Sequence, residues 1–166
     1  MTAGEAPLRS GLPDNHWNRR PPLNTSPRLS ALVPAAGMGT RLGRGPKCLL
    51  EIEGRSLLDI LLTTLAPLAD QVLVGAPADS LDEVRAIVAA RGTVIVGGAS
   101  REATLDILLA EAFGDVILIQ DAARPFASPG LCRAVADAAA EHGAAGAFLD
   151  PMVPVGRLAD GEVSHC

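Results

Sequence analysis

From Leu29 onward, short apolar runs alternate with stretches of amphipathic helical pattern, and this alternation constrains the fold more than any other feature. The apolar runs carry hydrophobic residues on both faces, as buried strands do. They predict five strands, at 29–35, 71–77, 93–98, 115–121 and 144–150. Strands that alternate with helices predict right-handed crossovers and a mostly parallel sheet with helices on both faces, an α/β fold.

The predicted helices have recognisable start and stop residues. Ser56, Ser100 and Ser128 stand where N-caps are expected, and Pro129 would occupy the first helical position after Ser128. A fourth helix has the spacing of a capping box, from Ser80 to Glu83, and its pattern ends at Gly92. Each helix lies between two predicted strands.

Length and composition predict one domain with a disordered tail. A chain of 166 residues can bury an ordinary core, and with 2% aromatic residues that core must be built from Ala, Val, Leu and Ile. Residues 1–28 hold five of the thirteen prolines and few aliphatic residues, so we expect a disordered N-terminal tail and a domain over 29–166.

Charge and cysteine content exclude several classes of protein. A net charge of -5 gives no basic face for nucleic acid. The three cysteines lie far apart, without the spacing of a zinc site, and are expected as reduced thiols. Neither a membrane span nor a signal peptide is recognisable, so a cytoplasmic protein is expected.

The first loop combines glycines with positive charge. In a parallel sheet, ligands bind beyond the carboxyl ends of the strands, and the stretch "PAAGMGTRLGRGPK" follows the first predicted strand there. Gly37 and Gly39 allow backbone amides to approach an anion, while Arg41 and Lys47 supply full charges. The pattern indicates a loop that cradles a triphosphate.

Two commoner phosphate loops do not fit this stretch. The dinucleotide pattern GxGxxG fails because Leu42 stands where the third glycine is required. The Walker pattern fails because Pro46 interrupts it and Cys48 replaces the Ser or Thr that would bind magnesium. A Rossmann dehydrogenase is therefore the least favoured alternative.

Two further loops carry polar residues at the same predicted edge. "GGASREATL" ends a strand and opens a helix, whose N-terminus favours an anionic or polar ligand. "IQDAARPF" places Asp121 directly after an apolar run, where a carboxylate suits magnesium bound to substrate phosphates, and Arg124 follows three residues later. An ordinary turn or cap remains the alternative reading of Asp121.

Taken together, these three stretches resemble, in the same order and at similar separations, the 2-C-methyl-D-erythritol 4-phosphate cytidylyltransferases of the non-mevalonate isoprenoid pathway. The resemblance covers about residues 30–165. It implies a Rossmann-like three-layer α/β/α fold of the nucleotide-diphospho-sugar transferase type, with magnesium-bound CTP along the first loop. A phosphate oxygen of methylerythritol phosphate would attack the α-phosphorus, and pyrophosphate would leave.

The resemblance also implies a role for each matching residue. Arg41 and Lys47 would be catalytic, by neutralising charge on the α-phosphate, and Asp121 would bind both the metal and the substrate. Arg124 and Arg157 would bind the substrate. The nucleotide would contact Ala35, Ala36, Gly37, Gly39, Gly98, Arg101 and Thr104. Small-molecule substrates and a homodimer are the partners implied.

The chain departs from the family pattern at several positions. Gln120 replaces a histidine, and Cys48 replaces a glutamine. Pro154 and Val155 occupy the positions of an Asp-Thr pair near the acceptor, and Arg157 stands in for a lysine. The sequence ends at Cys166, before the family's last third, which predicts a domain incomplete at its C-terminal end.

Two alternatives from different classes stay open. Val155 favours a nucleotidyltransferase that acts on another sugar or polyol phosphate or on a pterin cofactor. The short C-terminal part favours a non-catalytic nucleotide-binding protein.

Overall fold

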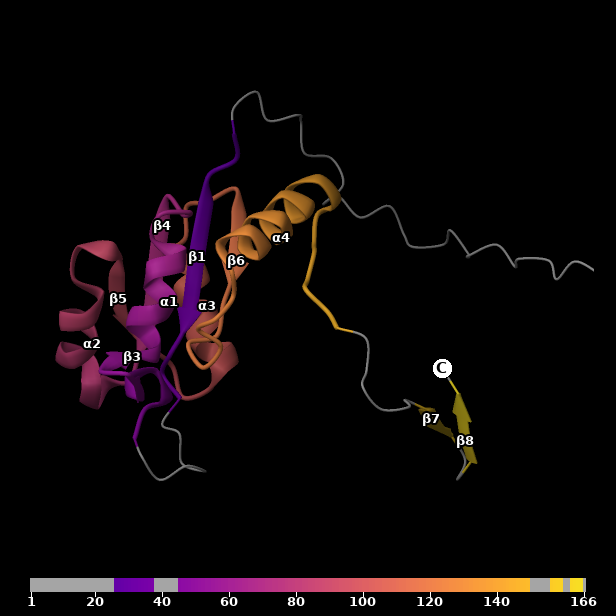
Figure 1. Ribbon diagram of the computed structural model, residues 1–166, viewed down its shortest axis with the longest axis horizontal. Helices are drawn as coiled ribbons and strands as arrows, with labels where there is room; N and C mark the ends of the chain where they lie inside the picture. The colour runs from indigo at the N-terminus through magenta and orange to yellow at the C-terminus, as the bar shows by residue number, and fades with distance from the viewer. Residues whose placement is uncertain (1–25, 38–44, 150–155, 160–161, 166) are drawn as a thin grey trace, which may run out of the picture.

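The structure is a computed structural model that describes residues 26–37, 45–149, 156–159 and 162–165, the last two ranges as backbone only (Figure 1). The tail predicted for residues 1–28 falls almost wholly outside these ranges, so the domain boundaries stay a prediction. Within the described ranges, no helix has both the length and the apolar character that a membrane span requires.

A parallel sheet of four strands forms the centre of the domain, in the order β5-β4-β1-β6. The strands are β1 (Leu29–Pro34), β4 (Gln71–Ala76), β5 (Thr93–Val96) and β6 (Val116–Ile119). Strand β1 pairs with β4 on one side and with β6 on the other, both in parallel register. Four of the five predicted strands are thereby confirmed.

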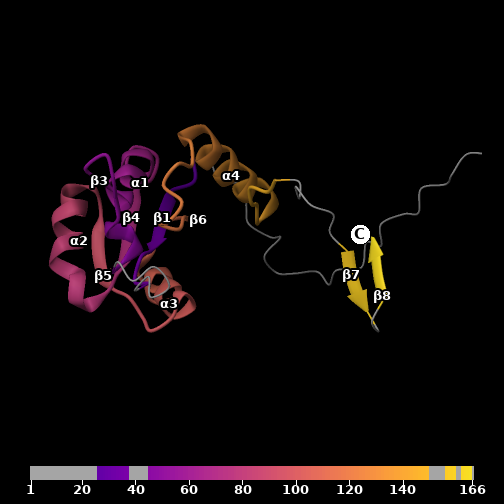
Figure 2. The same ribbon diagram turned by 60° about the horizontal axis from the view of Figure 1, so that its bottom comes forward.

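Helices cover both faces of this sheet, as predicted (Figure 2). Side chains alternate along β1, so that Ala31 and Val33 face one helical layer and Leu32 faces the other. The first layer consists of α1 (Leu57–Leu65), α2 (Leu81–Val88) and α4 (Pro129–His142). The second is α3 (Arg101–Glu111), whose Leu108 packs against Leu32.

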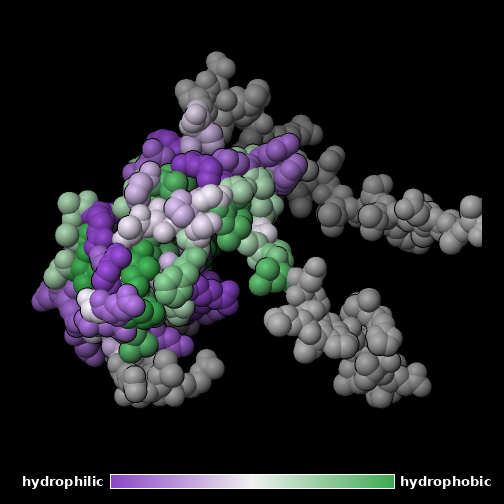
Figure 3. Space-filling model, in the orientation of Figure 1, coloured by the Kyte–Doolittle hydropathy of each residue, from purple (hydrophilic) through white to green (hydrophobic). Residues whose placement is uncertain are grey.

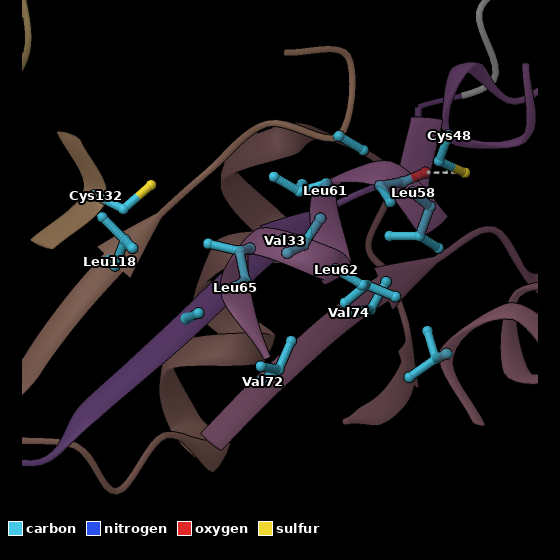
Figure 4. Packing of buried hydrophobic residues seen from close by; sticks show 14 of the residues in the cluster. Val33, Cys48, Leu58, Leu61, Leu62, Leu65, Val72, Val74, Leu118 and Cys132 are labelled. Atoms are coloured by element: carbon cyan, nitrogen blue, oxygen red, sulfur yellow. Dashed lines mark hydrogen bonds between the residues drawn. The ribbon is translucent and has the colours of Figure 1, made fainter. Parts of the chain in front are cut away.

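The larger core is almost entirely aliphatic. Leu58, Leu61, Leu62 and Leu65 of α1 are fully buried over the sheet, and Cys132 of α4 extends the same core toward β6 (Figure 4). The leucines recur with helical spacing, so one face of α1 supplies most of the apolar contact. This packing fixes the strands whose carboxyl ends carry the predicted loops.

Three of the four predicted N-caps are confirmed. The hydroxyl groups of Ser56, Ser100 and Ser128 accept hydrogen bonds from backbone N–H groups three residues on, at 3.1, 3.1 and 3.2 Å. The capping box at Ser80 is wrong, because a 3-10 turn, η3 (Ala78–Ser80), leads into α2 and the Ser80 side chain makes no cap hydrogen bond.

The helical segment ends at Gly92 as predicted, but it is not a single α-helix. The α-helix ends at Val88, and Ala89 takes a positive φ of 46°. A second 3-10 turn, η4 (Ala89–Arg91), then continues to Gly92. Gly92 also allows a close backbone approach, because a Cβ there would lie 2.7 Å from the carbonyl oxygen of Val72.

The fifth predicted strand is wrong over its described part. Residues 144–149 form no strand, and Phe148 and Leu149 are 91% and 96% exposed. Figure 3 shows this segment as hydrophobic surface that extends away from the sheet. An apolar run becomes a strand only when its backbone pairs with a neighbour, and this segment has no ladder with β6.

Two short hairpins were not predicted from the sequence. Strands β2 (Glu51–Ile52) and β3 (Arg55–Ser56) pair through a turn in which Glu53 and Gly54 have positive φ, as in the favoured two-residue hairpin turn. Strands β7 (Gly156–Ala159) and β8 (Glu162–His165) form the second hairpin.

Candidate functional site

The loops that follow β1, β5 and β6 leave the same edge of the sheet, because the strands that carry them are parallel. From β1 the chain crosses to β4 on one side, whereas β6 lies on the other side of β1. The strand order therefore reverses between β1 and β6. In open α/β sheets, ligands bind beyond the carboxyl ends of the strands at such a point.

The start of the first loop is held by a hydrogen bond to the neighbouring strand. Ala35 is buried, and its N–H donates to the carbonyl oxygen of Gly75 at 2.8 Å. Ala36 is half-buried and Gly37 is exposed, so the chain rises from the core to the surface over these three residues. Gly39 and Arg41, which the sequence predicts to complete the phosphate cradle, lie outside the described residues.

Lys47 is the first residue of a short 3-10 helix, η2 (Lys47–Leu49), that packs beside the start of the first loop. The next residue, Cys48, is buried, and its thiol donates to the carbonyl oxygen of Ala35 at 3.6 Å. Burial raises the pKa of this thiol to about 11, so it stays protonated as a donor at neutral pH. The predicted catalytic lysine is therefore anchored beside the end of β1.

The second loop lies directly against the first. Gly97 continues from β5, and its N–H donates to the carbonyl oxygen of Ala76 at 2.8 Å. A Cβ on Gly97 would stand 2.4 Å from the Cβ of Ala36, which is far closer than two carbon atoms can approach. Glycine at this position thus lets the two predicted nucleotide-binding loops touch.

Thr104 fixes the second loop through hydrogen bonds of its side chain. Its side chain is buried, its hydroxyl accepts from the N–H of Gly98 at 3.1 Å, and it donates to the carbonyl oxygen of Ser100 at 2.8 Å. Its methyl group lies over Gly75, where an added Cβ would be 2.4 Å away. The predicted contact of Thr104 with the nucleotide stays a prediction, and its hydroxyl in this structure fixes Gly98.

The third loop is a tight turn after β6. The N–H of Gln120 extends the sheet by donating to the carbonyl oxygen of Leu32, and the N–H of Arg124 donates to the carbonyl oxygen of Asp121, both at 3.0 Å. The side-chain amide of Gln120 donates to the carbonyl oxygen of Arg124 at 2.9 Å. Gln120 thus closes the turn that carries Asp121 and Arg124.

The second and third loops are joined by an ion pair between two predicted site residues. Nε and Nη2 of Arg101 both lie 3.0 Å from Oδ1 of Asp121, although the two residues are 20 positions apart. Arg101 is the first residue of α3, where a positive charge opposes the helix dipole. Asp121 offsets that charge.

A different carboxylate neighbours Arg101 in sequence without binding it. Hydrogen bonds to its own backbone N–H and to the Ser100 side chain lower the pKa of the Glu102 carboxyl group. Glu102 therefore stabilises the helix start, and Asp121 is the partner of Arg101.

A hollow of about 770 Å3 lies beside the third loop, between β6, α4 and residues 145–147. Its lining is mostly apolar, and Gln120 and Arg124 are among its few polar side chains. Arg124 is exposed, so its guanidinium is free to approach a ligand from solvent. Of Arg157 only the strand position in β7 is described, and its predicted role as a substrate ligand stays a prediction.

The described residues do not form a complete metal cage, since no three His, Cys, Asp or Glu side chains among them come together. Asp121 is a half-buried carboxylate at the edge of the sheet. Magnesium is commonly held by one or two carboxylates together with substrate phosphates and water, and this donor set fits that mode.

Three residues that shape the site were not among the predicted site residues: Cys48, Gly97 and Gln120. Each is adjacent in sequence to a predicted residue, which is the signal that could have found it. Cys48 and Gly97, however, contact Ala35 and Ala36 of the first loop, and sequence adjacency does not reveal those contacts. Gln120 contacts the backbone of Arg124 within its own turn.

The sheet, its two helical layers and the three converging loops define a Rossmann-like α/β domain of the nucleotidyltransferase type. A comparison with protein families supports this class directly. The model of the 2-C-methyl-D-erythritol 4-phosphate cytidylyltransferase family, IspD, matches residues 29–156. The chain belongs to this family.

Individual relatives agree with the family match. The enzyme of that name from Deinococcus radiodurans is 48% identical over 124 residues, which are 75% of this chain and 52% of the relative. The Thermus thermophilus enzyme is 41% identical over 127 residues, or 76% of this chain and 55% of the relative. The chain thus spans about half the length of the curated relatives it matches.

Solved structures show the same fold. The crystal structure of the cytidylyltransferase from Thermus thermophilus matches with a TM-score of 0.63 and 33% identity, over 82% of this chain and 63% of that one. Rv0371c from Mycobacterium tuberculosis matches with a TM-score of 0.60 and 25% identity, over 70% of this chain and 63% of that one.

Proposed function

We propose that the protein transfers the cytidylyl group of CTP to 2-C-methyl-D-erythritol 4-phosphate and releases pyrophosphate, a step in the synthesis of isoprenoid precursors. The observation that carries the proposal is the convergence of the three family motifs at one edge of the sheet. Gly97 is in contact with Ala36, and Arg101 is paired with Asp121, so the second loop touches both the first and the third. Membership in the family supplies the substrates.

The proposed chemistry is an in-line displacement at the α-phosphorus. A phosphate oxygen of the acceptor forms the new bond, the bond from the α-phosphorus to the bridging oxygen breaks, and pyrophosphate takes the electron pair. Arg41 and Lys47 neutralise the charge that gathers on the α-phosphate, which is the main work that such a reaction requires of a protein. The anchoring of η2 through Cys48 keeps Lys47 in place.

The remaining predicted residues position the substrates. Backbone groups of Ala35, Ala36, Gly37 and Gly39 contact the phosphates, and Gly98, Arg101 and Thr104 frame the cytidine. Arg124 and Arg157 bind the phosphate of the acceptor. Asp121 binds magnesium, which when bound supplies charge neutralisation on the triphosphate. We also propose that the protein is cytoplasmic and forms a homodimer.

Pyrophosphate release tests this proposal. The full chain is incubated with magnesium, methylerythritol phosphate and each nucleoside triphosphate in turn. Pyrophosphate release is expected when the nucleotide is CTP and not with the other nucleoside triphosphates. Lys47→Ala should lower the rate by about a hundredfold or more. Arg85→Gln removes a cation from an exposed pair on α2 and serves as the charge-matched control with an unchanged rate. Absence of CTP-dependent release from the full chain contradicts the proposal.

Two other outcomes identify the alternatives. Release only with another sugar or polyol phosphate, or with a pterin, identifies a different acceptor, which Val155 at the position of the family threonine favours. Binding of CTP without release identifies a non-catalytic nucleotide-binding protein.

A further inference from the structure

The ion pair between Arg101 and Asp121 joins the two groups that the proposed reaction needs separately. Two guanidinium nitrogens of Arg101, Nε and Nη2, lie 3.0 Å from the same carboxylate oxygen, Oδ1. Within the described ranges, no hydrogen bond reaches Oδ2 of Asp121. The pair therefore occupies the guanidinium and the carboxylate with one another.

The pair is accessible and weak enough to be exchanged. The side chains of Arg101 and Asp121 are 51% and 32% exposed, so water screens their attraction. Ion pairs with this exposure are worth little, and a ligand that offers either partner a stronger contact displaces the other. The oxygen acceptors of a nucleotide offer that contact to a guanidinium, and a divalent cation offers it to a carboxylate.

The backbones on both sides of the pair are fixed, so the exchange involves side chains alone. Arg101 is held by the start of α3, where Ser100 caps the helix at 3.1 Å. Asp121 is held by the turn that the Gln120 side chain closes at 2.9 Å. Release of the pair then re-aims two side chains without moving either loop.

We propose that Arg101 and Asp121 form an exchangeable pair that links nucleotide binding to divalent-cation binding: the bound nucleotide draws Arg101 away, and the released carboxylate of Asp121 becomes available to the cation. This inference rests on the proposed function and adds a positioning role to Arg101. Each ligand that binds alone must break the pair, whereas two ligands that bind together break it only once. Each ligand should therefore raise the affinity for the other by about two- to fivefold, the range expected for an ion pair this exposed.

Metal-free nucleotide binding separates this role from simple charge repulsion. The affinity for CTP is measured in EDTA by calorimetry, for the full chain and for Asp121→Asn. Asp121→Asn releases Arg101, so the affinity should rise about two- to fivefold. In the Arg101→Gln background the same substitution should have no effect, because no pair remains to be released. Glu102→Gln, which removes a carboxylate beside Arg101 that does not bind it, is the matched control and should leave the ratio between the two backgrounds unchanged.

Manganese supplies a second readout from the cation side. Free Mn2+ is followed by electron paramagnetic resonance in the absence of nucleotide. Arg101→Gln should tighten Mn2+ binding about two- to fivefold, and the double variant with Asp121→Asn should lose this gain. None of the substituted side chains is buried, and circular dichroism of each variant checks that the fold is retained.

The outcomes separate the two proposals. If CTP binds and Asp121→Asn raises its affinity equally in both backgrounds, charge repulsion accounts for the effect and the exchange is refuted, while the proposed function stands. If the full chain binds no CTP with or without magnesium, both proposals fail. If the rise depends on Arg101, the exchange is supported.

Discussion

Replacement of Thr104 by valine tests how the second loop is held. Valine has nearly the same shape as threonine, so the methyl group over Gly75 is retained and only the hydroxyl is lost. The carbonyl oxygen of Ser100 keeps its helical hydrogen bond from the N–H of Thr104, at 3.0 Å. The N–H of Gly98 loses its 3.1 Å acceptor.

The expected cost follows from that single unpaired donor. A buried donor without a partner costs about 1–3 kcal/mol, and because Gly98 is half-buried we expect about 1–2 kcal/mol for Thr104→Val. Thr104→Ser keeps the hydroxyl and loses one buried methyl group, which costs about 1 kcal/mol. The two variants therefore lose similar stability for different reasons.

Two assays distinguish these reasons. Urea unfolding followed by circular dichroism gives the loss of stability, and amide hydrogen exchange followed by NMR reports on Gly98. Thr104→Val should speed exchange at Gly98 by about five- to thirtyfold, as a local cost of about 1–2 kcal/mol requires. Thr104→Ser should leave it protected in the folded state. Equal exchange at Gly98 in the two variants would refute the reasoning.

Three other predictions concern packing and pH. Gly97→Ala should destabilise the fold by about 1–3 kcal/mol in urea unfolding, because its Cβ would stand 2.4 Å from that of Ala36, whereas Gly37→Ala, with open space around it, should have little effect. Cys48 ionises near pH 9 when unfolded and near 11 when folded, so stability should fall as pH rises through this interval, and Cys48→Ala should show less of that fall in a pH series of urea titrations. Arg55 and Arg91 lower the pKa of Asp59, so the stability that these ion pairs contribute is present at neutral pH and is lost as the pH falls below the ordinary carboxyl pKa of 3.8. Asp59→Asn should therefore flatten the acid limb of the melting temperature plotted against pH, and an unchanged limb would contradict this contribution.

The sequence predicted well what depends on local pattern. Apolar runs with both faces hydrophobic located β1, β4, β5 and β6, because parallel strands between two helical layers have no solvent face. The hydroxyl caps at Ser56, Ser100 and Ser128 were also predicted, because a cap and its N–H partner lie three residues apart.

The errors arose where a neighbour decides the conformation. Residues 144–149 have the composition of a strand, but a strand also requires a backbone partner, which no sequence window contains. Ser80 and Glu83 have the spacing of a capping box, yet the preceding 3-10 turn sets a backbone conformation in which the hydroxyl makes no cap bond. In both cases the local pattern was necessary and not sufficient.

By itself, the sequence determined the layered α/β fold, the family, and the three stretches that bear the candidate site, because each of these depends on patterns of residues close together in the chain. Tertiary structure alone decided which of those residues touch. The contact of Gly97 with Ala36, that of the Thr104 methyl group with Gly75 and the pairing of Arg101 with Asp121 all depend on strand order and register. These contacts arise because the packing of helices on the sheet brings distant segments within a few ångströms, a distance that residue spacing along the chain does not encode.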